Sequence, residues 1–164
     1  MNFIPNGTTY TLNANHIKTL NLTTEKENIY LKINNDDTLT NLNIEGFINV
    51  TIDNCKSLQN IVSAGNKLHS ITITNCPELL KIEANVENCN SITTDINSNK
   101  LESLVFYING ENQSLTTLKL PQSKINKIEY RDSSNNNPIY VSPDKTFNLK
   151  PFIRLNDFDI RGNN

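Results

Sequence analysis

Apolar side chains recur along the chain in a short pattern, apolar-x-x-apolar-x-apolar, that alternates between two sets of segments. The clearest copies are VTIDNCKSLQNI (50–61) and ITITNCPELLKI (71–82), whose apolar positions and Asn-Cys pair coincide after 21 residues. Within each set the spacing runs from 19 to 26 residues. A period of this length predicts a solenoid, in which each coil buries its apolar side against its neighbours. The first set is Ile17-Leu20-Leu22, Leu39-Leu42-Ile44, Leu58-Ile61-Ser63, Leu79-Ile82-Ala84, Leu101-Leu104-Phe106 and Ile125-Ile128-Tyr130. The second set is Asn28-Leu31-Ile33, Phe47-Val50-Ile52, Leu68-Ile71-Ile73, Cys89-Ile92-Thr94 and Leu115-Leu118-Leu120.

Each coil therefore contains two short, nearly straight segments. Their last two apolar positions alternate with the strand period of two, and no stretch between them keeps a helical period of 3.6. We predict a mainly β, right-handed parallel solenoid of five or six coils, with short strands, little helix and a C-terminal cap. Like segments of successive coils should pair about 4.8 Å apart.

The regular pattern divides the chain into three parts. We predict an N-terminal cap or docking segment at 1–16, a solenoid at 17–130, and a linker with a C-terminal cap at 131–164. The stretch DSSNNNP (132–138) is typical of a loop, and residues 139–160 contain four aromatic side chains. A terminal coil exposes open strand edges and core. The last segment therefore either covers that end or docks on a partner.

Composition narrows the choice of partner and compartment. Asparagine occupies 30 of the 164 positions, which suits a chain that turns every few residues. Nucleotide bias in an A/T-rich genome is the alternative explanation, and the sequence favours neither. The net charge is −2 with no basic run, so we expect no binding to nucleic acid. No secretion signal and no membrane-spanning run are evident. We therefore expect a cytoplasmic or virion-associated protein without membrane contact.

Two stretches resemble the irregular leucine-rich repeats of bacterial surface proteins of the BspA and internalin type. They are LHSITITNCPELLKIEA (Leu68–Ala84) and LTTLKLPQSKINKIEY (Leu115–Tyr130). The resemblance covers roughly residues 17–130. It implies a leucine-rich-repeat solenoid that binds other macromolecules or glycans, without catalytic residues. The pattern departs from that family at Asn28, Ser63 and Thr94, where leucine is expected.

The three cysteines are predicted to be structural. Cys55 and Cys76 occupy equivalent turn positions one coil apart, and we place Asp36 and Asn97 at the same position of neighbouring coils. Cys89 takes an apolar position. Stacked side chains point the same way, which disfavours a disulfide, and the spacing of a zinc site is missing. We predict buried thiols, no metal and no cofactor.

No catalytic constellation is apparent, so we predict that the chain is not an enzyme. His16 and His69 have no matching acid, and the carboxylates Glu83 and Glu129 are not specified as a catalytic pair. Outward rows of hydroxyl side chains and the loop at 109–114 are the better binding candidates. The predicted binding surface consists of Thr51, His69, Ser70, Thr72, Ser91, Thr93, Asn109, Glu111 and Asn112.

The preferred function is a non-enzymatic scaffold that binds a protein or glycan ligand. The alternative is a structural subunit of a larger assembly that contacts its neighbouring subunits, such as a decoration or fibre protein of a bacteriophage virion. Small size, the absence of an export signal and the aromatic residues near the chain ends favour this alternative.

Overall fold

The computed structural model of the protein describes residues 2–6, 8–13, 16–120, 125–142 and 148–159. These residues form fifteen strands and no helix, so no helix in this part of the chain can span a membrane. The strands are β1 (Asn2–Asn6), β2 (Thr9–Asn13), β3 (Thr19–Thr23), β4 (Tyr30–Asn34), β5 (Asn41–Glu45), β6 (Asn49–Asp53), β7 (Asn60–Ala64), β8 (Ser70–Thr74), β9 (Lys81–Asn85), β10 (Ser91–Thr94), β11 (Ser103–Ile108), β12 (Thr117–Lys119), β13 (Lys127–Asp132), β14 (Pro138–Val141) and β15 (Asp157–Asp159).

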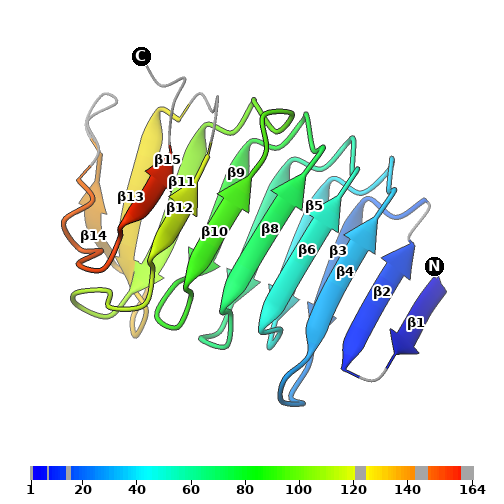
Figure 1. The fold of residues 1–164 in the computed structure, drawn as a ribbon, viewed down its shortest axis with the longest axis horizontal. Coiled ribbons are helices and arrows are strands. Elements are labelled where there is room, and N and C mark those ends of the chain that lie inside the picture. The colour runs from blue at the N-terminus through cyan, green and yellow to red at the C-terminus, as the bar shows by residue number, and fades with distance from the viewer. Residues whose placement is uncertain (1, 7, 14–15, 121–124, 143–147, 160–164) are drawn as a thin grey trace.

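Strands from β2 to β13 alternate between two facing sheets (Figure 1). Sheet A has the order β1-β2-β4-β6-β8-β10-β12-β15, and sheet B has the order β14-β13-β11-β9-β7-β5-β3. All neighbouring pairs are parallel except β1–β2 and β13–β14. The chain is thus a parallel β-solenoid of about six turns with short strands, which confirms the predicted fold class. Its handedness and the C-terminal cap stay predictions.

The two alternating sets of apolar triplets correspond to the two sheets. Leu42 of the first set lies beside Ile61 in sheet B, and Ile71 of the second set lies beside Ile92 in sheet A. One position of the triplets was placed wrongly: Asn28 is exposed with a φ of 56°, and Ile29 takes the core position at 4% exposure. The other two members of this triplet, Leu31 and Ile33, are buried as predicted.

The core is a thin layer between the inner faces of the two sheets. Leu42, Ile61 and Ile71 are fully buried, and even the polar substitutes Ser63 and Thr94 are only 3% and 7% exposed. Full burial of an aliphatic side chain contributes roughly 1.5–3 kcal/mol. One coil has too few such residues to offset its own conformational entropy, so each coil depends on its neighbours.

Asparagine residues form the corners that follow sheet A strands. Asn35, Asn54 and Asn75 come directly after β4, β6 and β8, with φ values of 55°, 54° and 54°. Asparagine tolerates this left-handed conformation better than most residues. The Asn54 amide also donates a 2.7 Å hydrogen bond to Asn35 Oδ1 in the preceding coil. The asparagine content therefore has a structural role at these corners.

A second ladder lies inside the same corners. Asp36, Cys55 and Cys76 are all fully buried in successive coils, as predicted. The fourth member is Ser98 rather than Asn97, because the corner after β10 takes one more residue before it turns inward. Asn97 is exposed instead, and its amide donates to Asn75 Oδ1 at 2.7 Å.

The two ends of the solenoid differ from the middle. At the N-terminal end β1 pairs antiparallel with β2, and β2 pairs parallel with β4 although it lies in the segment 1–16. At the C-terminal end β14 turns back antiparallel beside β13, and β15 follows β12 in sheet A. The predicted domain boundaries stay predictions.

Candidate functional site

The outer face of sheet A carries the predicted rows of hydroxyl side chains. Thr51, Thr72 and Thr93 lie in register on β6, β8 and β10, and Thr93 Oγ1 donates to Thr72 Oγ1 at 3.3 Å. In the neighbouring row Ser70 Oγ donates to Asn49 Oδ1 at 2.7 Å, and Ser91 follows in register. Many of these polar groups therefore bond to one another along the sheet.

His69 lies outside these rows. It is exposed and comes directly before β8, at a corner that leads from sheet B to sheet A. It lines a pocket of about 240 Å³ with Glu27, Ile48 and Asn88. His69 is therefore an exposed surface residue of this corner.

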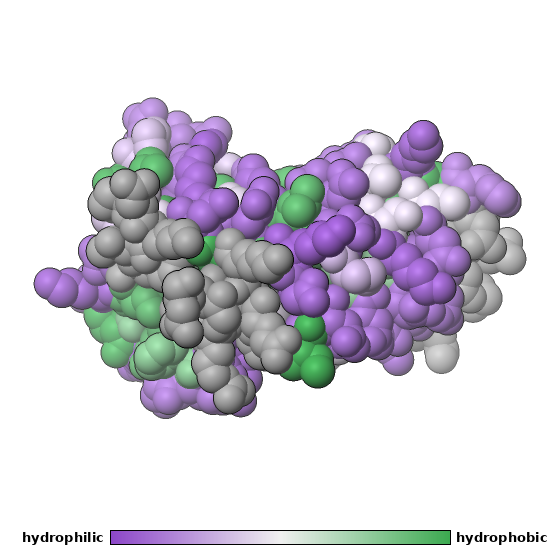
Figure 2. Space-filling view, turned by 90° about the horizontal axis from the view of Figure 1, so that it is seen from above, coloured by the Kyte–Doolittle hydropathy of each residue, from purple (hydrophilic) through white to green (hydrophobic). Residues whose placement is uncertain are grey.

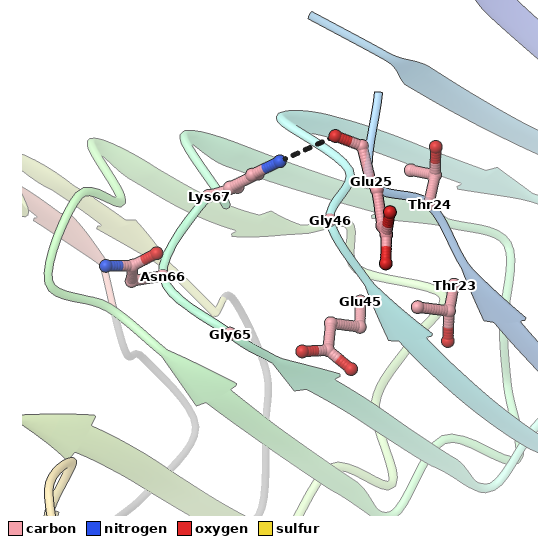
Figure 3. A pocket seen from close by; sticks show the side chains of 8 residues that line it. All are labelled: Thr23, Thr24, Glu25, Glu45, Gly46, Gly65, Asn66 and Lys67. Atoms are coloured by element: carbon pink, nitrogen blue, oxygen red, sulfur yellow. Dashed lines mark hydrogen bonds between the residues drawn. The ribbon is translucent and has the colours of Figure 1, made fainter. Parts of the chain in front are cut away.

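A second pocket of about 390 Å³ lies beside it along the same corners (Figure 3). Its floor is the connection between β5 and β6, which spans only residues 46–48, whereas the connections on either side span 24–29 and 65–69. Lys67 reaches across this notch and donates to the Glu25 carbonyl oxygen at 3.2 Å. The walls also carry Glu45 and the Glu25 carboxylate. The notch is polar and open, and its shape follows from unequal corner lengths.

Gly46 makes the short corner possible. Its φ is 89°, and a Cβ at this position would lie 1.9 Å from the Thr24 carbonyl oxygen. Only glycine fits such a close approach of two backbones. The floor of the notch is therefore bare main chain.

The loop after β11 divides into exposed and buried residues. Asn109 and Glu111 are exposed, as the predicted binding surface requires. Asn112 was placed on that surface wrongly, because it is only 4% exposed. Its amide donates to the Val86 carbonyl at 2.5 Å, and its Oδ1 accepts from the Leu115 amide at 2.8 Å. Asn112 anchors the base of the loop.

Exposed apolar side chains concentrate at the C-terminal end. Four large apolar residues of this end are about half exposed, and we call them the end surface. They are Ile139 (57%), Val141 (49%), Ile153 (50%) and Phe158 (58%). Elsewhere in the described chain only Tyr30 and Ile96 are comparable. Hydrophobic surface appears near the β13–β14 end, at the left of Figure 2, beside a predominantly hydrophilic remainder.

A pocket of about 500 Å³, the end pocket, opens at the same end. Its lining includes apolar and aromatic side chains and two charged groups: Ile108, Glu111, Tyr130, Ile139, Tyr140 and Lys150. This volume and a mostly apolar lining are typical of ligand sites. Only Glu111 of this set belongs to the predicted binding surface. The sequence feature that indicated this end of the molecule was the aromatic content that follows Tyr130.

A charged network covers the outer face of sheet B nearby. The Glu129 carboxylate accepts from Lys127 at 2.7 Å and from Arg131 at 2.6 Å, while Glu83 binds Lys81 at 2.6 Å and the Tyr107 hydroxyl. Burial raises the pKa of both carboxyls, but these hydrogen bonds and cations outweigh it and lower each pKa below 4.5. Both groups are ionised at neutral pH and fully engaged, which does not suit a general acid.

The cysteines are free and buried. The pKa of Cys55 is raised by its hydrogen bond with Cys76 and by burial, and burial raises that of Cys89 to about 12. The raised pKa makes the Cys55 and Cys89 thiols poor nucleophiles. Within the described residues no three His, Cys, Asp or Glu side chains are grouped to hold a metal ion.

These features define the class of protein as a two-sheet parallel β-solenoid with an apolar, pocketed C-terminal end. No family model matches the sequence, and no match was found among curated proteins or solved structures.

Proposed function

We propose that this chain is a non-enzymatic binding scaffold whose C-terminal end docks on a partner protein. The observation that carries the proposal is the concentration of Ile139, Val141, Ile153 and Phe158 at that end, where Ile139 also lines the end pocket. Exposed apolar patches of this kind mark interaction sites. Burying the exposed half of one such side chain contributes on the order of 1 kcal/mol, so the four together supply a sizeable share of a typical binding free energy.

The edge strands also support docking at the C-terminal end. β15 and β14 are the last strands of sheets A and B at the C-terminal end. An edge strand presents backbone groups that pair readily with another chain. Phe158 of β15 lies in register with the core residue Leu118, so a partner that covers Phe158 continues the core.

A protein partner fits better than a glycan. The hydroxyl rows of sheet A are the candidate glycan surface, but several of their groups already form hydrogen bonds within the sheet. Thr93 donates to Thr72, and Ser70 donates to Asn49. The end surface is apolar, which favours burial against protein. The leucine-rich-repeat resemblance agrees with a binding role, although each coil here has two strands in place of the strand and helix or 3₁₀ turn common in such repeats.

The second candidate is an architectural subunit of a larger assembly, such as a bacteriophage virion. Among the described residues β14 and β15 have no further strand beside them, which favours this role because an assembly offers a permanent neighbour for such edges. In both candidates the C-terminal end makes the contact. They differ in whether the neighbour is present at fixed stoichiometry.

The experiment begins with the protein purified from its own source under mild conditions and weighed by native mass spectrometry. The identified companion is then titrated with two purified variants, Phe158→Ser and Ile96→Ser. The two side chains are 58% and 56% exposed, so both variants should fold, and Ile96 lies in the corner between β10 and β11.

We expect Phe158→Ser to weaken binding at least about tenfold and Ile96→Ser to leave it unchanged. A symmetric particle with fixed stoichiometry favours the architectural role, and a saturable one-to-one complex favours the scaffold. A monomer without companions, or equal effects of the two variants, contradicts the proposal.

A further inference from the structure

An aromatic ladder ends at the C-terminal end of sheet B. Phe106, Tyr130 and Tyr140 occupy the same inward position in β11, β13 and β14. The rings of Phe106 and Tyr130 stack with centroids 6.4 Å apart, and those of Tyr130 and Tyr140 stack at 5.4 Å. In the preceding coils this position of sheet B holds Ile44, Ser63 and Ala84, so this row of the core becomes aromatic only at this end.

Phe152 braces the ladder from the side. Its ring packs edge-on against Phe106 at 5.6 Å and against Tyr130 at 5.5 Å. The Tyr130 hydroxyl donates to the Asn148 carbonyl at 2.5 Å, which holds the segment after β14 against the same rings. The half-buried ring of Tyr140 is thus set on a rigid base, and it lines the end pocket.

The end pocket has the size and lining for one aromatic side chain. It measures about 500 Å³, and Ile108, Ile139 and Pro151 contribute apolar walls beside the two tyrosine rings. Aromatic rings gain from stacked and edge-to-face contacts beyond the area they bury. A ring that enters here has the apolar walls and both tyrosine side chains to contact.

Two opposite charges border the pocket. Glu111 and Lys150 both line it, and among the described residues neither takes part in an ion pair. The nearby carboxylates Glu83 and Glu129 are paired with lysine or arginine. A partner with charges complementary to Glu111 and Lys150 gains attraction at the rim of an apolar site.

We propose that the end pocket binds an aromatic side chain of the partner protein, in an extended segment with a basic residue for Glu111 and an acidic residue for Lys150. This inference rests on the proposed docking function of the C-terminal end. A second copy of this chain is the competing occupant, because Phe158 is an exposed aromatic residue at the same end. Its immediate neighbours are Asp157 and Asp159, which suit Lys150 and repel Glu111.

The chain contains no tryptophan, so a tryptophan peptide is a fluorescent probe without background. The probe is acetyl-Gly-Lys-Trp-Glu-Gly-amide. The same peptide with alanine in place of tryptophan is added as the control competitor. Peptides with Lys-Trp-Lys and Glu-Trp-Glu centres test the charge preference. Sedimentation of the protein alone tests self-association.

Ile139→Ser and Ile96→Ser are a matched pair of variants. The two side chains are 57% and 56% exposed, but only Ile139 lines the pocket. We expect saturable binding with a blue-shifted tryptophan emission, weakened about tenfold by Ile139→Ser and unchanged by Ile96→Ser. The alanine peptide should not compete.

The preference for peptide charge is tested with Glu111→Gln, and Glu102→Gln serves as the exposed control. The unmodified protein should bind Lys-Trp-Lys and Glu-Trp-Glu about equally, because Lys150 offsets Glu111. Glu111→Gln should create a preference of about threefold for Glu-Trp-Glu, the size expected of an exposed ion pair. Glu102→Gln should leave the two peptides equal.

Absence of saturable binding, or equal binding by the Ile139→Ser variant, overturns the inference. A dimer that Ile139→Ser dissociates also overturns it, in favour of the second copy. If the peptide fails while Phe158→Ser still releases the natural companion, the docking function stands and only the aromatic anchor is wrong.

Discussion

The middle coils, between β4 and β10, and the C-terminal end are built from similar short strands but differ in how completely their inward residues are covered. In the middle, each coil is covered by a neighbour on both sides, and residues such as Ile71 are fully buried. At the C-terminal end the aliphatic ladder gives way to aromatic rings, and Phe158 is 58% exposed although it lies in register with core residue Leu118. The difference shows that a core position in a solenoid is buried only when a further coil follows. An apolar residue at an end is therefore available for an intermolecular contact.

The largest effect is expected when one inward-facing residue is replaced in each region. Ile71→Ala should lower the free energy of unfolding by about 4 kcal/mol, because it leaves a cavity at a fully buried position. Phe158→Ala should lower it by less than about 1 kcal/mol, since most of the ring is already in water. Urea denaturation of the two variants measures both values. Equal losses would mean that the C-terminal end is as tightly packed as the middle.

Glycines at corners of the two regions provide the next test. Gly46→Ala should cost about 3 kcal/mol, because the new Cβ meets the Thr24 carbonyl oxygen and φ is 89°. Gly110→Ala should cost only about 1 kcal/mol, since no atom lies within 4 Å of the new Cβ and only the φ of 68° is unfavourable. Thermal unfolding compares the two. A larger loss for Gly110→Ala contradicts the assignment of a close backbone approach to the middle region.

A pH titration of stability sharpens the comparison through the charged network at β9, β11 and β13. The folded-state pKa of Glu129 is lowered, so its ion pairs add stability at pH values above 4.5. That stability is lost as the pH falls through the lowered pKa. We expect the free energy of unfolding to decline in acid, and Glu129→Gln to show a shallower decline. Identical pH profiles for the two proteins would exclude this role.

The smallest effect is expected on the outer face of sheet A. Thr72→Val removes an acceptor of the 3.3 Å bond from Thr93 but keeps the β-branched shape that strands favour. Stability should change by less than about 0.5 kcal/mol, and binding of the companion should not change. Denaturation and titration with the companion measure both. Loss of binding here would move the functional surface from the C-terminal end to the hydroxyl rows.

The regular middle of the molecule was predictable because strand period and coil length are both visible in the sequence. The two alternating sets of triplets assigned the strands to two sheets, with Asn28 as the one misplaced position. Asn28 and Asn97 were wrong for the same reason. Both lie in corners that take an additional residue, and spacing alone does not reveal where a corner places it. Asn112 looked like an exposed loop residue, but tertiary hydrogen bonds to Val86 and Leu115 bury it.

The end pocket was beyond sequence reasoning because its lining comes from segments far apart in the chain. Ile108 ends β11 and Glu111 lies in the loop after it, Tyr130 belongs to β13, and Lys150 lies after β14. No periodic pattern connects them. Periodicity stops after Tyr130, so the aromatic content of the last segment indicated an unusual end without specifying its shape.

The sequence by itself determined the parallel two-strand coil, the inward apolar ladder and the burial of Cys55 and Cys76, because these follow from local periodicity repeated in register. The tertiary structure decided which terminal residues stay exposed, where the notch beneath Lys67 opens and how the aromatic ladder ends beside a pocket. These features depend on corner lengths and on the absence of a further coil beyond β15 among the described residues. Burial is a property of neighbours in space, and only the folded stack defines them.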